Sequence, residues 1–413
     1  MLGICGGGFS RDFRYTSPMS FLGDISAPVF IRQYWQRHPL VMRGVLPDSA
    51  ALMTGDELAG IACQDDAEAR IITARDETWT CESGPFAESR FADLPATGWT
   101  LLVQAVDQWV PKIAALLEHF AFLPRWRLDD IMISYAVDGG GVGPHFDYYD
   151  VFLLQASGAR QWRIGRHCDA STPLQDHPDL RLLRDFETLE KHVLNTGDLL
   201  YVPAGRAHWG IAAGDDSITI SIGFRAPSHR DLILGAAEVL AEGPADSARY
   251  CDTEASIDTD PYLINAAATQ QALAAWPGIS NTEPGDTEWK PPSTALRTAL
   301  THALGVQSTE PRYPEHIEAA MQWTADALNK WLARGGQQTI EHHRASRFAY
   351  HIDSDGEQPH AHLYVDGQRY TTTVRLARGL CHGRIMAEHV CDPRERELLL
   401  SLINAGSVSI RPR

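Results

Sequence analysis

The sequence predicts an α+β chain of several domains, with a small antiparallel barrel or sandwich as its main domain. The chain has 413 residues, more than one hydrophobic core usually serves, so two or three domains are expected. From Trp126 to Pro227, short apolar runs are separated by Gly, Asp and Pro. Strands of this length and spacing are typical of an antiparallel barrel or sandwich.

The composition is that of a globular protein, with 44% hydrophobic and 22% charged residues. No apolar run approaches the ~20 residues that a membrane-spanning helix requires. The seven cysteines are odd in number, widely spread and without a C-x-x-C motif, which favours a reducing cytoplasm over a disulfide framework. The net charge of -17 disfavours binding to nucleic-acid phosphates and favours a basic partner, although it also serves solubility.

Before the barrel, the chain begins with a leader, 1–24, which lacks the apolar region of a signal peptide and is compatible with disorder. The elements expected next are a helix over 29–44 that breaks at Pro39 and is followed by a short strand, a helix over 54–62, strands over 69–81, and a helical segment over 99–122 that restarts at Pro111.

Five apolar runs are expected to form the strands of the barrel. They are 130–137, 150–155, 161–164, 199–202 and 217–224, with 166–195 as a longer insertion. Phe224-Arg225-Ala226-Pro227 ends this region, and a new type of pattern follows.

After the barrel the pattern becomes helical and then mixed. Helices are expected over 232–242, 262–276 and 294–304, with a linker at 277–292, and then a strongly amphipathic helix over 315–334, strands over 348–352, 362–365 and 368–372, a helix over 394–404 and a final strand over 408–411. Asp366-Gly367 is a hairpin signal between two of these strands. Helix, hairpin and helix in this order are compatible with a small winged-helix-like unit.

The motif His-x-Asp occurs five times, at His145, His167, His177, His229 and His351, so spacing alone cannot identify a metal site. His229 lies at an expected helix start, His167 and His177 lie in the polar insertion, and His351 lies in a polar hairpin. For these four, a structural role is the preferred interpretation.

His145 differs because a glycine-rich segment, 139–143, precedes it and an apolar strand follows it. Glycines let the backbone turn tightly and pass close to a ligand. In an extended segment, residues two apart point to one face, so His145 and Asp147 could bind one ion together. No helix or βαβ unit follows the glycines, which excludes a dinucleotide-binding loop.

A third ligand is expected from a distant strand of the same barrel. The segment 197–208, G-D-L-L-Y-V-P-A-G-R-A-H, contains a turn, a strand and a second turn, and ends at His208. Two histidines and one carboxylate form the facial triad of non-haem Fe(II) oxygenases. Zinc hydrolases use the same ligand types, so zinc is the alternative at this point.

Arg160 favours an oxygenase over a hydrolase. It begins the strand that returns after the turn at Ser157-Gly158, and from there its side chain can lie inside the barrel. A buried guanidinium requires an anion, and its planar shape suits a carboxylate. 2-Oxoglutarate would bind Fe(II) at one end and Arg160 at the other. Ser134 could add a hydroxyl donor, and a charge on a surface hairpin is the alternative role for Arg160.

Four segments together resemble the bacterial ribosomal oxygenases of the JmjC class: D-D-I-M-I-S-Y (129–135), G-G-G-V-G-P-H-F-D-Y-Y-D-V-F (139–152), Q-W-R-I-G (161–165) and S-I-G-F-R-A-P (221–227). The similarity spans roughly residues 25 to 227. Members of this family are Fe(II)- and 2-oxoglutarate-dependent hydroxylases, with O2 as the second cosubstrate. Their substrate is an arginyl side chain of the sixteenth large-subunit ribosomal protein, and eukaryotic relatives hydroxylate histidyl residues of other ribosomal proteins.

The resemblance implies a multi-domain α+β fold with three parts. These are a JmjC oxygenase domain over 25–227, which is a double-stranded β-helix or cupin-like jelly-roll barrel, a helical dimerisation region over 228–309, and a winged-helix-like C-terminal domain over 310–413. It also implies a homodimer in the cytoplasm whose partner is a ribosomal protein of the large subunit, with no direct DNA binding and no membrane contact.

The resemblance also assigns roles to residues of this chain. The metal ligands are His145, Asp147 and His208, and the 2-oxoglutarate contacts are Ser134 and Arg160. For a substrate arginine, the expected contacts are Asp130, Tyr149 and Ser221, and the chemistry is centred on the metal. The alternatives are a hydroxylase of a histidyl residue or of tRNA, and a binding or assembly factor with an inactive metal site, against which the complete set of ligands argues.

Overall fold

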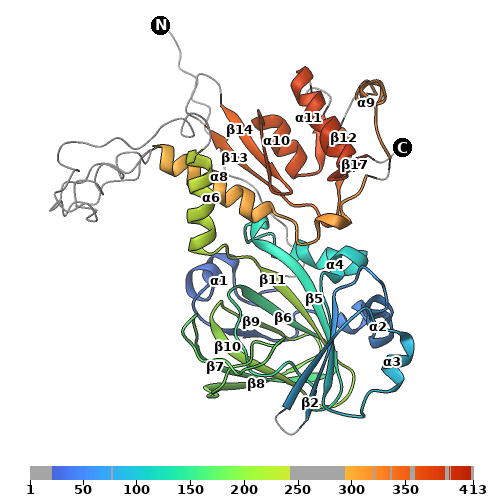
Figure 1. Ribbon diagram of the computed structural model, residues 1–413, viewed down its shortest axis with the longest axis vertical. Helices are drawn as coiled ribbons and strands as arrows, with labels where there is room; N and C mark the ends of the chain where they lie inside the picture. Colours follow the sequence, from blue (N-terminus) through green and yellow to red (C-terminus); the bar gives the residue numbers. More distant parts are fainter. Residues whose placement is uncertain are drawn as a thin grey trace, which may run out of the picture. The chain divides into compact units, whose positions relative to one another are not determined.

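The computed structural model describes residues 21–75, 78–241, 294–319, 321–334, 337–353, 359–386, 390 and 392–410. The chain divides into two compact units (Figure 1). The first comprises Met1–Leu123 and Leu128–Phe224, and the second comprises Pro124–Arg127 and Arg225–Arg413. Among the described residues, none of the helices is both long enough and apolar enough to cross a bilayer.

The first unit contains a large antiparallel sheet of eight strands. In spatial order they are β1 (Leu40–Met42), β9 (Leu199–Val202), β6 (Asp150–Ser157), β11 (Ser217–Phe224), β5 (Leu128–Ala136), β4 (Trp99–Val103), β2 (Ala69–Arg75) and β3 (Thr78–Ser83). A second antiparallel sheet has the order β10 (Arg206–Ala212), β7 (Ala159–His167) and β8 (Glu190–Asn195). The expected antiparallel double-sheet architecture is therefore present.

The two sheets of the first unit pack face to face. Val151 and Leu153 of β6 belong to the same buried apolar cluster as Trp162 and Ile164 of β7. The opposite face of the large sheet packs against a larger apolar cluster that also includes residues of the surrounding helices. Those helices are α1 (Ala27–Gln33), η1 (Ser49–Leu52), α2 (Gly55–Ala62), α3 (Glu88–Ala92), α4 (Val106–Trp109), α5 (Pro111–Ala114) and η2 (Ala115–Phe120).

The sequence of β11 explains how one strand serves both faces. It reads Ser-Ile-Thr-Ile-Ser-Ile-Gly-Phe, and all eight residues are buried. Because side chains alternate along a strand, Ile218, Ile220 and Ile222 point into the large cluster, while the small polar residues point toward the second sheet. A polar interior therefore lies between the two sheets.

Several local predictions for the first unit need correction. Residues 99–103 were expected to be helical, but they form β4, whose five residues are all buried between β2 and β5. A short apolar run fits a buried helix or a buried strand equally well, and here the neighbouring strands decide. Strands β8 and β10 were not predicted. Phe21 and Leu22, at the end of the expected leader, are buried in the large cluster.

In its described residues, the second unit combines helices with two small sheets. Its helical elements are η3 (Arg125–Arg127), α6 (His229–Ala241), α8 (Thr294–Thr309), η6 (Pro314–His316), α9 (Ala325–Leu332), α10 (Val374–Cys381) and α11 (Pro393–Asn404). One sheet has the order β13 (Phe348–Asp353), β14 (His360–Val365) and β15 (Gln368–Thr373). The other has the order β16 (Arg384–Met386), β12 (Gln337–His342) and β17 (Val408–Ile410). Ala236 of α6 packs on Ala299 and Ala303 of α8.

The predicted hairpin at Asp366-Gly367 is confirmed, with φ angles of 50° and 76° that suit a tight turn between strands. The predicted helix over 315–334 is wrong, because among the described residues of this range only the end of η6 and α9 are helical. Thr324 caps α9 by accepting the N–H of Ala327, and the segment before it is held by Asn404, which bonds both backbone groups of Trp323. The helix expected over 262–276 and the linker over 277–292 lie outside the described residues.

Candidate functional site

The glycine-rich segment before β6 lies against β10. A Cβ atom at Gly141 would meet the carbonyl oxygen of Gly210 at 2.3 Å, so this approach requires glycine. The segment ends in an isolated bridge in which His145 and His208 exchange both backbone hydrogen bonds, at 3.0 and 2.8 Å. The two imidazole rings are therefore neighbours, with centroids 4.3 Å apart.

Asp147 completes a group of three potential ligands. Its Oδ2 atom lies 3.9 Å from His145 Nε2 and 3.6 Å from His208 Nε2. One ligand atom from each of the three residues lies within 4.8 Å of the others. The structure thus brings together the three residues that the sequence nominated as metal ligands, and two imidazoles with one carboxylate suit Fe(II), Zn(II) and related ions.

The hydrogen bonds of the two histidines favour this use. Their Nδ1 atoms lie 2.9 Å from the carbonyl oxygen of Gly143 and 3.0 Å from that of Arg206, respectively. A carbonyl oxygen can only accept, so Nδ1 carries the proton and Nε2 keeps its lone pair for a metal. Burial, followed by the nearby His145, lowers the pKa of His208 to about 4, so its ring is neutral at pH 7.

Arg160 is buried in the polar interior, with 3% of its surface exposed. Its Nη1 donates to Ser134 Oγ at 3.1 Å, and its Nε donates to Ser217 Oγ at 3.4 Å. Burial lowers the pKa of Arg160 to about 10, so the guanidinium is still charged at pH 7. Within the described part of the chain, no carboxylate forms an ion pair with it. A buried cation that has only neutral partners is suited to bind an anionic ligand.

The strand register relates Arg160 to the three potential metal ligands. On paired strands β7 and β10, Arg160 lies opposite Ala212 and Ile164 lies opposite His208. The two positions are therefore about 13 Å apart along the strands. An extended arginine side chain and a short dicarboxylate together can span this distance.

The polar interior contains residues that the sequence analysis missed. Gln155 donates to Ser217 Oγ at 3.1 Å and accepts from Thr219 Oγ1 at 2.9 Å. Together with Ser134 and Arg160, these residues form a buried hydrogen-bonded network. The alternation of hydroxyl residues with isoleucine in β11 is the sequence signal that could have identified it.

The three residues expected to contact a substrate arginine lie near one end of the large sheet. Asp130 and Ser221 are buried on neighbouring strands, β5 and β11. One oxygen of Asp130 accepts the backbone N–H of Ala105 at 3.2 Å, which supports the start of α4. Tyr149 immediately precedes β6 and is 41% exposed. Of the three, only Tyr149 is exposed to solution, and the role of all three in binding a substrate stays a prediction.

The comparisons with known proteins agree with this geometry. A family model described as the JmjC domain matches residues 115–232. A probable ribosomal oxygenase from Haemophilus influenzae is 42% identical over 213 residues, which are 51% of this chain and 52% of that protein. The ribosomal protein uL16 3-hydroxylase of Escherichia coli is 38% identical over 242 residues, 57% of this chain and 62% of that protein. The matches thus span less than two thirds of either relative.

Solved structures match over a longer stretch. The ribosomal oxygenase YcfD from Escherichia coli aligns with 94% of this chain and 99% of its own, with a TM-score of 0.76 and 28% identity. A structure of the same protein in complex with cobalt and 2-oxoglutarate aligns equally far, with a TM-score of 0.75. The resemblance expected from the four sequence segments is confirmed, and residues 115–232 of this chain form a JmjC domain with a cupin-like fold.

Proposed function

We propose that this chain is an Fe(II)- and 2-oxoglutarate-dependent hydroxylase of the cytoplasm that acts on an arginyl side chain of the sixteenth large-subunit ribosomal protein. The observation that carries the proposal is the buried guanidinium of Arg160, which has no acidic partner among the described residues and belongs to the same unit as the two histidines and the aspartate. The name and the cobalt and 2-oxoglutarate complex of the Escherichia coli relative support the choice of reaction and cosubstrate.

His145, Asp147 and His208 would hold the iron. Their Nε2 and carboxylate atoms converge within 4.8 Å, and this donor set suits Fe(II). When bound, the iron and 2-oxoglutarate together supply the oxidation, in which O2 is consumed, 2-oxoglutarate becomes succinate and CO2, and one oxygen atom is added to a substrate carbon. The backbone contacts of the two Nδ1 atoms fix the orientation of both rings.

Arg160 and Ser134 would bind the distal carboxylate of 2-oxoglutarate. The guanidinium is charged and already oriented by Ser134 and Ser217, so little reorganisation is needed on binding. The apolar cluster of Val151, Leu153 and Trp162 on the two facing sheets excludes water around the cosubstrate. This arrangement disfavours the zinc-hydrolase alternative, which has no use for Arg160.

Asp130, Tyr149 and Ser221 would position the substrate arginine. A carboxylate can pair with the guanidinium, an aromatic ring can pack on the alkyl part, and a hydroxyl can add a hydrogen bond. This would hold the arginine with its 3-position toward the iron. The net charge of -17 suits a basic ribosomal protein and disfavours tRNA, while a histidyl residue of another ribosomal protein remains the alternative substrate.

The decisive experiment is mass spectrometry of ribosomal proteins from cells with and without this chain. We expect one arginine of the sixteenth large-subunit protein to gain the mass of one oxygen atom only when the chain is present. A cell that carries His208→Ala serves as the matched control and should lack the modification. If the added oxygen is found on a histidine, the alternative substrate is correct, and if no ribosomal protein changes, the proposal fails.

We further propose that the region over 228–309 mediates a homodimer and that 310–413 is a winged-helix-like unit for protein contacts. Support comes from Ile233 and Leu234 of α6, which are 61% and 51% exposed although large and apolar. Ile233→Glu/Leu234→Glu should therefore convert a dimer into a monomer in light scattering. Unchanged mass for this variant would contradict the assignment.

A further inference from the structure

A second group of histidines with a carboxylate lies in the C-terminal unit, on β13 and β14. Asp353 Oδ2 lies 3.6 Å from His360 Nε2 and 3.8 Å from His362 Nε2. One ligand atom from each of these residues lies within 4.8 Å of the others. We refer to Asp353, His360 and His362 as the C-terminal cluster.

The register of the strands produces this convergence. Asp353 lies opposite His360, and His351 lies opposite His362, so all four side chains point to one face of the sheet. The opposite face, which includes Ala361 and Leu363, packs into the apolar core of the unit. The residues of the cluster are therefore not required for the core, and their shared face is covered in part by α8.

The spacing fits a bound ion better than it fits direct hydrogen bonds. Distances of 3.6 and 3.8 Å are too long for an imidazole–carboxylate hydrogen bond. Ligand atoms of a tetrahedral zinc site lie about 3.3 Å apart, given zinc–nitrogen bonds of about 2.0–2.1 Å. The corresponding distances in the JmjC domain, 3.9 and 3.6 Å, are as long. In both groups the carboxylate-to-imidazole distances exceed those of a zinc site by a few tenths of an ångström.

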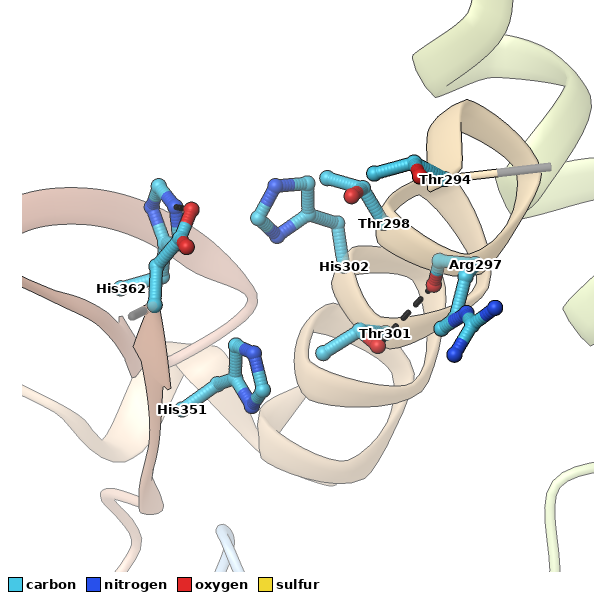
Figure 2. A pocket seen from close by; sticks show the side chains of 8 residues that line it. Thr294, Arg297, Thr298, Thr301, His302, His351 and His362 are labelled. Carbon is cyan, nitrogen blue, oxygen red and sulfur yellow. Dashed lines mark hydrogen bonds and ion pairs between the residues drawn. The ribbon is translucent and has the colours of Figure 1, made fainter. Parts of the chain in front are cut away.

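The surroundings of the cluster also resemble those of a metal site. His362 Nδ1 lies 3.4 Å from Thr371 Oγ1. With Nδ1 in this contact, the other ring nitrogen, Nε2, faces Asp353. A cavity of about 330 Å³ adjoins the cluster and is lined by Asp353, His362, His351, and His302 of α8. Figure 2 shows His351 and His362 on the strands facing His302 on the helix. His302 is fixed by Tyr364, whose hydroxyl lies 2.7 Å from its Nδ1.

We propose that Asp353, His360 and His362 bind a divalent transition metal of the zinc class, at a site separate from the one in the JmjC domain. Two imidazoles and one carboxylate suit such ions and do not suit Mg²⁺ or Ca²⁺. Asp353 ends β13 and His360 begins β14, so the ion joins the two strands across the segment that connects them. The remaining coordination position opens toward the cavity and takes water or a small ligand.

The test uses the full chain without a polyhistidine tag, in a background of Asp147→Ala/His208→Ala that removes two ligands of the first site. Zn²⁺ and Co²⁺ are titrated by calorimetry and by Co²⁺ absorption. We expect this background to bind one ion per chain. Adding His360→Ala/His362→Ala should weaken binding more than about 100-fold, because even outer contacts of metal ligands change affinity about 10- to 100-fold. His382→Ala, which removes an exposed histidine of the same unit, should change nothing.

Circular dichroism confirms that each variant is folded, and Asp353→Asn replaces the double variant if that one unfolds. Zn²⁺ should also raise the melting temperature of the background variant, and this rise should disappear with the cluster. The proposal is overturned if the background binds no ion, or if binding survives removal of the cluster. Because the readout is metal binding, the result does not depend on whether the proposed hydroxylase activity is correct.

Discussion

The two groups of histidines with a carboxylate use the same ligand types at nearly the same distances, yet they are built differently. In the JmjC domain, His145 and Asp147 follow a glycine-rich segment, and His208 comes from a strand that lies far along the chain. In the C-terminal cluster, Asp353, His360 and His362 come from the paired ends of two neighbouring strands. The first group requires the complete double sheet, whereas the second requires only one pair of strands.

The surroundings separate the two groups more clearly than the ligands do. Beside the first group, Arg160 is buried and charged within a network of hydroxyls. Beside the second, Arg297 lines the cavity but is exposed. A buried cation selects an anionic cosubstrate, whereas an exposed one is screened by water. A set of ligand residues therefore predicts metal binding, whereas the groups around the ligands predict the reaction.

The two groups should differ most in their effect on succinate formation. His208→Ala should reduce succinate formation from 2-oxoglutarate by at least about 100-fold while the chain stays folded, because it removes a metal ligand. His360→Ala/His362→Ala should leave succinate formation within about twofold of the wild-type value, since the C-terminal cluster takes no part in the reaction. Succinate is measured by NMR. Full turnover by His208→Ala would show that the first group is not the catalytic centre.

The next effect concerns the cosubstrate. Arg160→Ala would remove the two charge-assisted hydrogen bonds proposed between the guanidinium and the distal carboxylate of 2-oxoglutarate, at about 1.5–3 kcal/mol each. At least about 3 kcal/mol should be lost, and 2-oxoglutarate should bind about 100-fold more weakly. Arg163→Ala is the matched control, because Arg163 packs over the ring of Trp209 at 4.9 Å and lies outside the network. Calorimetry with a redox-inert metal measures the affinity of both variants for 2-oxoglutarate. Equal affinities would show that the cosubstrate does not bind at Arg160.

A smaller effect tests the C-terminal cluster alone. Thr371→Val removes the hydroxyl beside His362 Nδ1 and should weaken Co²⁺ binding there about tenfold. Measured in the Asp147→Ala/His208→Ala background, the change should appear in the Co²⁺ titration. In the otherwise wild-type chain, Thr371→Val should leave succinate formation unaltered. An altered rate would mean that the two groups are coupled.

The last prediction concerns the free energy of unfolding rather than metal binding or activity. The Tyr201 hydroxyl donates to buried Asp150 at 2.6 Å and accepts the N–H of Gln36 at 2.7 Å. Tyr201→Phe should therefore lower the free energy of unfolding by about 1–3 kcal/mol. Urea denaturation measures this change, and Co²⁺ binding at the C-terminal cluster is the control. A change in that binding would show that the cluster depends on more than its own strands.

The sequence predicted the parts of the fold whose pattern is local. The strands of the polar interior follow from apolar alternation, and the hairpin follows from Asp366-Gly367. Strand β4 was missed because its five consecutive residues, Thr100 included, are all buried and carry no periodicity. The helix over 315–334 was wrong because Asn404, far along the chain, holds Trp323. Contacts between distant residues decide such cases.

The sites show the same division. His145, Asp147 and His208 could be nominated because glycines and turns mark their positions. The C-terminal cluster was not predicted, since the motif at His351 and Asp353 is typical of a polar hairpin and no site was predicted at His360-Ala361-His362. Only the pairing of Asp353 with His360 brings these residues together, and that register cannot be read from either strand alone.

Strand β11 has a consequence for folding fidelity. It lies between β5 and β6, and it alternates Ser217, Thr219 and Ser221 with three isoleucines. A slip of one residue against either neighbour would move the hydroxyls into the hydrocarbon core and the isoleucines against Arg160. Misregistered chains are therefore strongly disfavoured during folding. The pattern that lines the proposed cosubstrate site therefore also fixes the register of β11. Variants of β11 that break the alternation are expected to misfold as well as to alter the site.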